Sequence, residues 1–141
     1  MKPKCRSKQI LVIDHNDHWR DFSVRTLQQA GFSIHAVDHY DFPSAKKQIR
    51  VTPDLVILGC ASVRSEEHEL IKYVLDQDIP LIILSTSQLS RKLTRELFLQ
   101  GVEDISEKSY DPDQLPIMVK QILDSLLALN SYQSAERTGE I

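Results

Sequence analysis

The sequence has few glycines and cysteines, no excess of positive charge and no long apolar run, and each shortage argues against a class of protein. With four glycines, and no glycine-rich loop after the first predicted strand, an enzyme that cradles a cofactor phosphate is disfavoured. The net charge of −3 offers no field that would attract nucleic acid or an anionic membrane. We therefore expect this domain to contact neither of them directly.

The same shortages bear on localisation. Cys5 and Cys60 are the two cysteines, and their separation does not suit a metal site, so a reduced, cytoplasmic setting is expected. The basic start, residues 1–8, is followed by an apolar run that ends at Asp14. That run is too short for a signal peptide or a membrane span.

What the chain does contain is a regular alternation of predicted strands and helices. Short runs of β-branched and other apolar residues predict strands at residues 9–13, 32–37, 55–58, 81–84 and 102–106. Helical periodicity predicts intervening helices at residues 18–30, 41–50, 65–77, 89–101 and 111–129. Because a helix separates successive strands, we expect parallel strands with helices on both faces. The last strand is less apolar than the third and fourth, so we place it at an edge, and we expect Asp17 to cap the first helix.

Four landmarks, in this order, resemble the receiver domain of two-component response regulators. They are the first strand with its acid, the third strand, the fourth strand, and the fifth strand with a later lysine: residues 10–14, 53–58, 79–85 and 101–104, then Lys108. The resemblance covers residues 8–128 and implies a five-stranded parallel, flavodoxin-like sheet in a three-layer α/β/α sandwich. We expect a receiver-like domain over residues 8–129 and a polar tail or linker over residues 130–141.

The chemistry of that family depends on residues that this chain has partly replaced. The resemblance implies phosphoryl transfer to an aspartate after the third strand, near Mg²⁺ held by an acidic pair, with a hydroxyl and a lysine on the phosphoryl oxygens. Here Gly59 stands at the acceptor position, and His15 replaces the second acid beside Asp14. Ser109 replaces the usual proline after the lysine, and Ile105 occupies the aromatic switch position. The lysine remains as Lys108, and Ser85 or Thr86 remains as the hydroxyl.

These departures predict an atypical receiver, or pseudo-receiver, that acts in signal transduction by protein contact without aspartyl phosphorylation. We expect it to catalyse no reaction, to need no cofactor or metal, and to regulate a dimer or an attached or partner effector. The alternative is a switch domain that binds a small anion, a nucleotide or a metal at a modified pocket formed by Asp14, a hydroxyl and Lys108.

Three features of the pocket can each be interpreted in two ways. Lys108 with Asp14 forms either an anion site or a structural salt bridge, since a partly buried charge needs a partner. The acids and imidazoles of residues 14–18 could hold a softer metal, although cap and solvent roles explain them equally. Cys60 is either redox-active or inert, and the sequence offers no nearby cysteine or cation to activate it.

The last predicted helix indicates a protein interface or a well-buried helix. Its apolar residues recur at the a/d spacing of a heptad: Leu115, Val119, Ile122, Leu126 and Leu129. The resemblance implies that the face formed by the fourth helix, the fifth strand and the fifth helix mediates dimerisation. We expect the interface residues on that face to be Leu89, Arg91, Arg95, Ile105, Tyr110, Met118 and Leu123.

Overall fold

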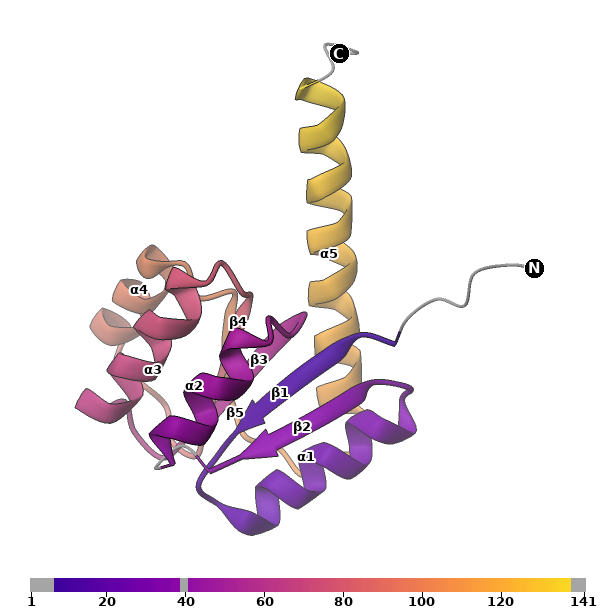
Figure 1. The fold of residues 1–141 in the computed structure, drawn as a ribbon. Coiled ribbons are helices and arrows are strands. Elements are labelled where there is room, and N and C mark those ends of the chain that lie inside the picture. Colours follow the sequence, from indigo (N-terminus) through magenta and orange to yellow (C-terminus); the bar gives the residue numbers. More distant parts are fainter. Residues whose placement is uncertain (1–6, 39–40, 138–141) are drawn as a thin grey trace.

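The computed structural model describes residues 7–38 and 41–137, which form a five-stranded parallel sheet between two layers of helices (Figure 1). The strands are β1 (Gln9–Ile13), β2 (Ser33–Val37), β3 (Leu55–Cys60), β4 (Leu81–Ser85) and β5 (Asp104–Glu107). The helices are α1 (Asp17–Gln29), α2 (Phe42–Arg50), α3 (Ser65–Asp76), α4 (Arg91–Gln100) and α5 (Gln114–Arg137). The strand order β2-β1-β3-β4-β5 confirms the predicted parallel α/β fold and the edge position of the last strand.

The central strands are buried because helices cover both of their faces. Every residue of β3 and β4 is buried, as their uninterrupted apolar runs predict. Side chains alternate along β1, so Ile10 and Val12 pack with residues of α1 and α5. Leu11 and Ile13 instead pack with residues of α2, α3 and α4. Figure 1 shows the same division, with α1 and α5 on one face.

Parallel pairing brings the carboxyl ends of the strands to one side of the sheet, here called the carboxyl edge. Cys60 of β3 lies opposite Ser85 of β4, which lies opposite Glu107 of β5. Residues at and just after these strand ends therefore converge, as in other open parallel sheets. The opposite side, where the strands begin, is called the amino edge.

Two boundaries near the carboxyl edge differ from the predictions. Asn16, not Asp17, caps α1, and its side chain accepts a hydrogen bond from the Trp19 N–H at 2.9 Å. Both residue types are good caps, so the sequence alone does not distinguish them. β3 continues through Gly59 to Cys60 because these residues still pair with β4. Gly59 therefore lies within the strand, whereas the predicted strand over residues 55–58 ended before it.

The last helix is longer than predicted. We expected it to end near Leu129, followed by a polar tail or linker over residues 130–141, but α5 continues to Arg137. Residues 130–137 contain neither glycine nor proline, so no strong breaker stops the helix. The predicted helix end near Leu129 is therefore wrong, while the division into a domain and a linker stays a prediction. Residues 138–141 lie outside the described residues. Of the helices in the described ranges, none combines the length and the apolar character that a bilayer span requires.

Candidate functional site

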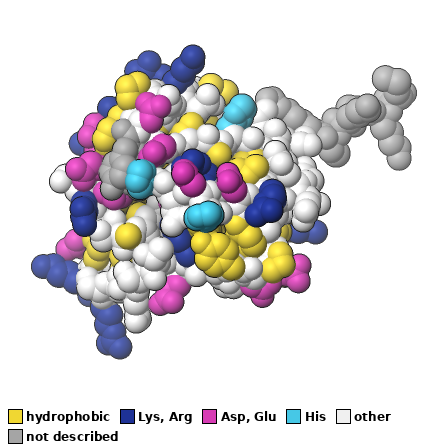
Figure 2. All heavy atoms as spheres, turned by 90° about the horizontal axis from the view of Figure 1, so that it is seen from below, with side chains coloured by type: hydrophobic (Ala, Val, Ile, Leu, Met, Phe, Trp, Pro, Cys, Tyr) yellow, Lys and Arg dark blue, Asp and Glu magenta, His cyan; other side chains and the backbone are white. Residues whose placement is uncertain are grey.

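The predicted pocket residues come from different strands and meet at the carboxyl edge. Asp14 directly follows β1, Gly59 lies in β3, Ser85 ends β4 and Lys108 follows β5. Figure 2 views this edge from below and shows acidic, basic and histidine side chains near its centre. The fold thus brings together residues that are far apart in the sequence.

A buried ion pair forms the centre of this pocket. Lys108 Nζ lies 2.8 Å from Asp14 Oδ2, and the two side chains are only 6% and 2% exposed. The same ammonium lies 5.0 Å from the centroid of the Trp19 ring, whose face attracts a cation. Because each charge already has a partner, the geometry favours the structural interpretation of Lys108 over an anion site.

The Asp14 carboxylate occupies the space that a side chain at position 59 would need. A Cβ added to Gly59 would lie 1.9 Å from Asp14 Oδ2 and 2.6 Å from Asp14 Cγ, far inside van der Waals contact. It would also lie 3.2 Å from Lys108 Cε. The lack of a side chain at Gly59 therefore leaves the space through which Asp14 reaches Lys108.

Asp14 is held in place by neighbours that the sequence analysis did not single out. The Asn16 N–H donates a hydrogen bond to Asp14 Oδ1 at 2.8 Å, and Arg20 Nη1 donates to the Asp14 carbonyl at 2.6 Å. The Asp14 N–H donates to the Val37 carbonyl at 3.0 Å. The sequence indicates these contacts only through the places of the two residues in the chain. Asn16 caps the helix that follows Asp14, and Arg20 lies in its first turns.

The two candidate hydroxyls lie in different surroundings. Ser85 is buried, and its hydroxyl donates to the Ser87 carbonyl while accepting from the Ser87 N–H at 3.1 Å. Thr86 is exposed, and its N–H donates to the Cys60 carbonyl at 3.0 Å. The Ser85 hydroxyl is thus used to shape the loop after β4.

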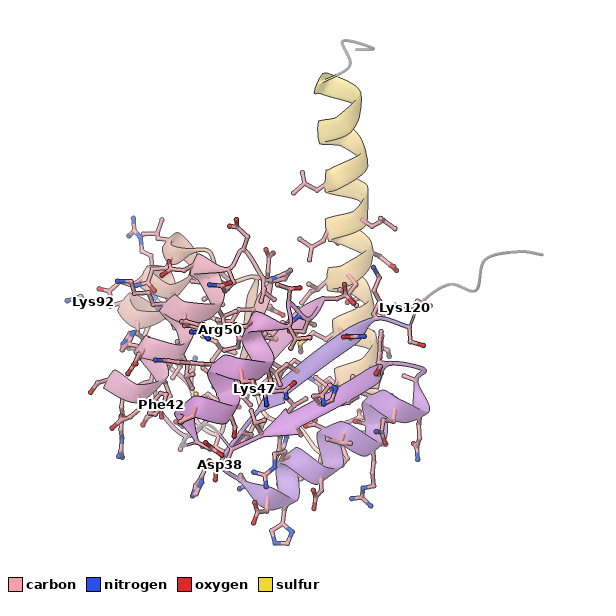
Figure 3. The ribbon with its side chains drawn as sticks, viewed as in Figure 1. Asp38, Phe42, Lys47, Arg50, Lys92 and Lys120 are labelled. Carbon is pink, nitrogen blue, oxygen red and sulfur yellow. The ribbon has the colours of Figure 1, made fainter. Side chains whose placement is uncertain are left out.

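His15 does not join Asp14. Its side chain is 59% exposed, and its Nδ1 lies 3.0 Å from a carboxylate oxygen of Asp38, which lies in the loop after β2 (Figure 3). Asp17 lies in the first turn of α1 and pairs with Arg20 at 2.5 Å. Over the ranges 7–38 and 41–137, no cluster of three His, Cys, Asp or Glu side chains is arranged to hold a metal ion.

Cys60 lies at the end of β3 and is 1% exposed. Burial and the nearby Glu67 carboxylate raise the pKa of the Cys60 thiol to about 12, against a smaller lowering by the Lys108 ammonium. Since the thiolate is the reactive form, the thiol is unreactive near neutral pH. This environment supports the inert interpretation of Cys60.

Part of the predicted interface lines one groove, here called the α4–β5 groove. It has a volume of about 710 Å³, and it includes Leu89, Arg91, Arg95 and Ile105. Phe98 lines the same groove and is 45% exposed. Lys92, also on α4, projects outward from the domain (Figure 3). The groove therefore combines apolar walls with a basic rim.

The other predicted interface residues lie elsewhere. Tyr110 packs edge-on against Phe22 of α1, with ring centroids 5.2 Å apart. Met118 and Leu123 pack against the core under α1 and α5. The structure does not place these three residues in the α4–β5 groove.

Comparisons with known proteins support the fold. No protein-family model matches the chain, and no curated protein matches it. A response regulator from Thermotoga maritima is 20% identical with a TM-score of 0.71, over 84% of this chain and 99% of that chain. Chemotaxis protein CheY4 from Vibrio cholerae is 20% identical with a TM-score of 0.69, over 83% and 99%. NtrX from Brucella abortus, in complex with ADP, is 22% identical with a TM-score of 0.76, over 95% of this chain and 30% of that chain. These likenesses confirm the predicted receiver-type fold.

Proposed function

We propose that the chain is a receiver-like signalling domain that acts by protein contact, without aspartyl phosphorylation and without a catalytic step of its own. Its fold, which is similar to that of response regulators, supports the signalling role. The observation that carries the rest is the Asp14 carboxylate, which fills the space beside Gly59 and pairs with Lys108. The group that would receive a phosphoryl group is missing, and the remaining charges neutralise one another.

The alternative function, binding of a small anion, nucleotide or metal at this pocket, has less support. An anion that reached Lys108 would have to displace a carboxylate that lies 2.8 Å from the ammonium. That displacement would leave the Asp14 charge buried without its partner, which is strongly unfavourable. We therefore prefer protein contact to ligand binding at the pocket.

For the contact surface, we propose the α4–β5 groove, with a second copy of the chain as its occupant. Arg91 and Arg95 line this groove, and a group of acids lies on the adjoining β5 and the approach to α5: Asp104, Asp111 and Asp113. In a two-fold symmetric dimer a surface meets itself, so the basic rim of one copy can face the acids of the other. Nucleic acid is a poor partner by comparison, since the net charge is −3.

The first experiment tests the pocket with Mg²⁺ and beryllofluoride, which mimics a phosphoryl group where an acceptor carboxylate exists. We expect no saturable change in the amide resonances of Asp14, Ser85 and Lys108, and no change in the fluorescence of Trp19. A receiver domain with an intact acceptor aspartate, measured in the same buffer, is the positive control. Saturable shifts around Asp14 would contradict the proposal and support the ligand-binding alternative.

The second experiment tests the dimer by sedimentation velocity. We expect Arg95→Glu to weaken self-association by about tenfold, because it places an acid opposite the acids of the other copy. Asp113→Lys combined with Arg95→Glu should recover part of the loss. Lys92→Glu makes the same charge change on the outward side of α4 and serves as the control. Equal effects of Lys92→Glu and Arg95→Glu would argue against this surface.

A further inference from the structure

A second groove lies at the amino edge, at the opposite end of the sheet from the Asp14 pocket. It has a volume of about 570 Å³ and lies between the loops that precede β3, β4 and β5 and the side of α5. Leu123, Leu126 and Leu127 of α5 line it, and Leu127 is 64% exposed. Figure 1 shows α5 passing this edge and continuing beyond it. One wall of this amino-edge groove is therefore apolar and accessible.

The other wall is acidic. Asp54, Asp78 and Glu103 line the groove, while Lys8 is the one basic residue among its lining residues. Across the part of the chain that the structure describes, Asp78 and Glu103 take part in no ion pair. Helices α3 and α4 end at this groove, and neither has a basic residue in its last turn. Their negative carboxyl ends add to the field of the carboxylates.

The backbone around the groove is unusual. Thr52 and Asp78 both line it, and both have left-handed backbones, with φ of 57° and 58°. Aspartate tolerates this region, but a β-branched residue such as Thr52 rarely adopts it. Both residues follow a helix end: the Thr52 N–H donates to the Ile49 carbonyl at 2.9 Å after α2, and the Asp78 N–H donates to the Leu75 carbonyl at 3.0 Å after α3. These two turns end the helices and fix the shape of the groove at its rim.

We infer that the amino-edge groove docks a basic, amphipathic peptide segment of a partner protein. The leucines of α5 cover the apolar side chains of the segment, and Asp78 and Glu103 meet its lysines or arginines. An acidic surface of this kind repels the phosphates of nucleic acid. The inference stands apart from the proposed function, because it uses neither the Asp14 pocket nor the α4–β5 groove.

The test is an amide NMR titration of the full chain with a short amidated peptide built of lysine and leucine. The matched control is the same peptide with glutamate in place of lysine. We expect the lysine peptide to give saturable shifts at Asp78, Gly101 and Glu103, and the glutamate peptide to give none there. Raising the salt concentration should weaken binding, since the contacts are partly exposed charges.

Variants then separate the contribution of the acidic wall of the groove to peptide binding from that of its apolar wall. Asp78→Asn with Glu103→Gln should weaken binding about tenfold, and asparagine still tolerates the left-handed backbone at position 78. Asp21→Asn with Glu66→Gln removes the same charge from exposed positions elsewhere and should change nothing. Leu127→Ser should weaken binding while Ile117→Ser, at the other end of α5, should not.

Three results of the titration would overturn the inference. Neither peptide binds, or both bind equally, or the Asp78 and Glu103 variant binds the lysine peptide as well as the unchanged chain does. A second copy in the groove is also an overturning outcome, and Leu127→Ser would then abolish self-association. The dimer proposed above is distinguishable, because it depends on Arg95 and not on Leu127.

Discussion

Two clusters in this domain make the same kinds of contact in opposite surroundings. Each joins a lysine to a carboxylate and an aromatic ring: Lys108, Asp14 and Trp19 in the buried cluster, and Lys46, Glu69 and Tyr73 in the exposed cluster. The ion-pair distances are 2.8 and 3.1 Å, and the ammonium-to-ring distances are 5.0 and 5.5 Å. The charged side chains are 6% and 2% exposed in the first cluster, and 35% and 58% exposed in the second.

Burial, and not the list of contacts, gives the two clusters different roles. An exposed pair contributes little, because water and salt screen it and its long side chains lose entropy. A buried pair has given up its hydration, so each charge depends on the other. The buried cluster therefore fixes the pocket in one arrangement, which supports the phosphorylation-independent role that we propose.

The sharpest test of this comparison is the same substitution in both clusters. Lys108→Met removes the ammonium but keeps most of the side-chain volume, and it leaves the Asp14 carboxylate buried without its partner. We expect a loss of about 3–5 kcal/mol in the free energy of unfolding, measured by urea denaturation. Lys46→Met, the matched control, should cost less than about 1 kcal/mol. Similar losses for both variants would show that burial does not separate the clusters.

A smaller effect is expected when a methyl group is added beside the buried cluster. Gly59 does not have a left-handed backbone, so Gly59→Ala is disfavoured by crowding alone. Its new Cβ would lie 1.9 Å from Asp14 Oδ2, and we expect a loss of as much as about 3 kcal/mol in the free energy of unfolding. In an Asp14→Ala background the same substitution should cost little. A cost that is unchanged in that background would mean that Asp14 does not occupy this space.

The sequence predicted the fold well because the fold depends on local patterns. The apolar runs of the third and fourth strands were long enough to indicate burial on both faces. The resemblance then assigned Asp14, Gly59 and Lys108 to one pocket. Element ends were predicted less well. The cap of α1 and the end of β3 were each misplaced by one or two residues, and the last helix is longer than predicted because residues 130–137 are polar yet contain no helix breaker.

The arrangement inside the pocket could not be predicted in the same way. Whether Asp14 turns toward Gly59 depends on the space between neighbouring strands, which no sequence spacing reports. The resemblance assigned His15 to the pocket, next to Asp14 in the chain, but it pairs with Asp38 outside the pocket. Adjacent residues often point in different directions, so chain proximity is a weak guide to a shared site.

The ionisation of the Cys60 thiol reports whether water reaches the interior beside the buried cluster. Burial, then the Glu67 carboxylate, raises the pKa of the folded thiol to about 12, whereas an unfolded thiol titrates near about 8.5. The neutral thiol therefore makes its full contribution to the stability of the folded state at any pH below the pKa of the unfolded thiol. This contribution is lost as the pH rises from that pKa toward the pKa of the folded thiol. At pH 9.5 the loss should be about 1.4 kcal/mol.

The measurement compares urea unfolding of the chain and of Cys60→Ala at pH 7.5 and pH 9.5. The difference in free energy between the two proteins should shrink at the higher pH, because the variant lacks the titrating group. Other groups that ionise in this range affect both proteins alike and cancel. A difference that does not depend on pH would show that solvent reaches the thiol.

The smallest predicted effect concerns the residue that links the cap of α1 to the buried cluster. The Asn16 side chain accepts from the Trp19 N–H at 2.9 Å, so Asn16→Ala removes the cap and loosens the ring that faces Lys108. We expect a loss of about 1 kcal/mol together with a change in Trp19 fluorescence. Ser90→Ala removes the equivalent cap of α4, where the Ser90 hydroxyl accepts from the Leu93 N–H at 3.1 Å. It should lower stability by a similar amount and leave the fluorescence unchanged. If both variants alter the fluorescence, the Trp19 signal follows stability in general and does not report on the buried cluster.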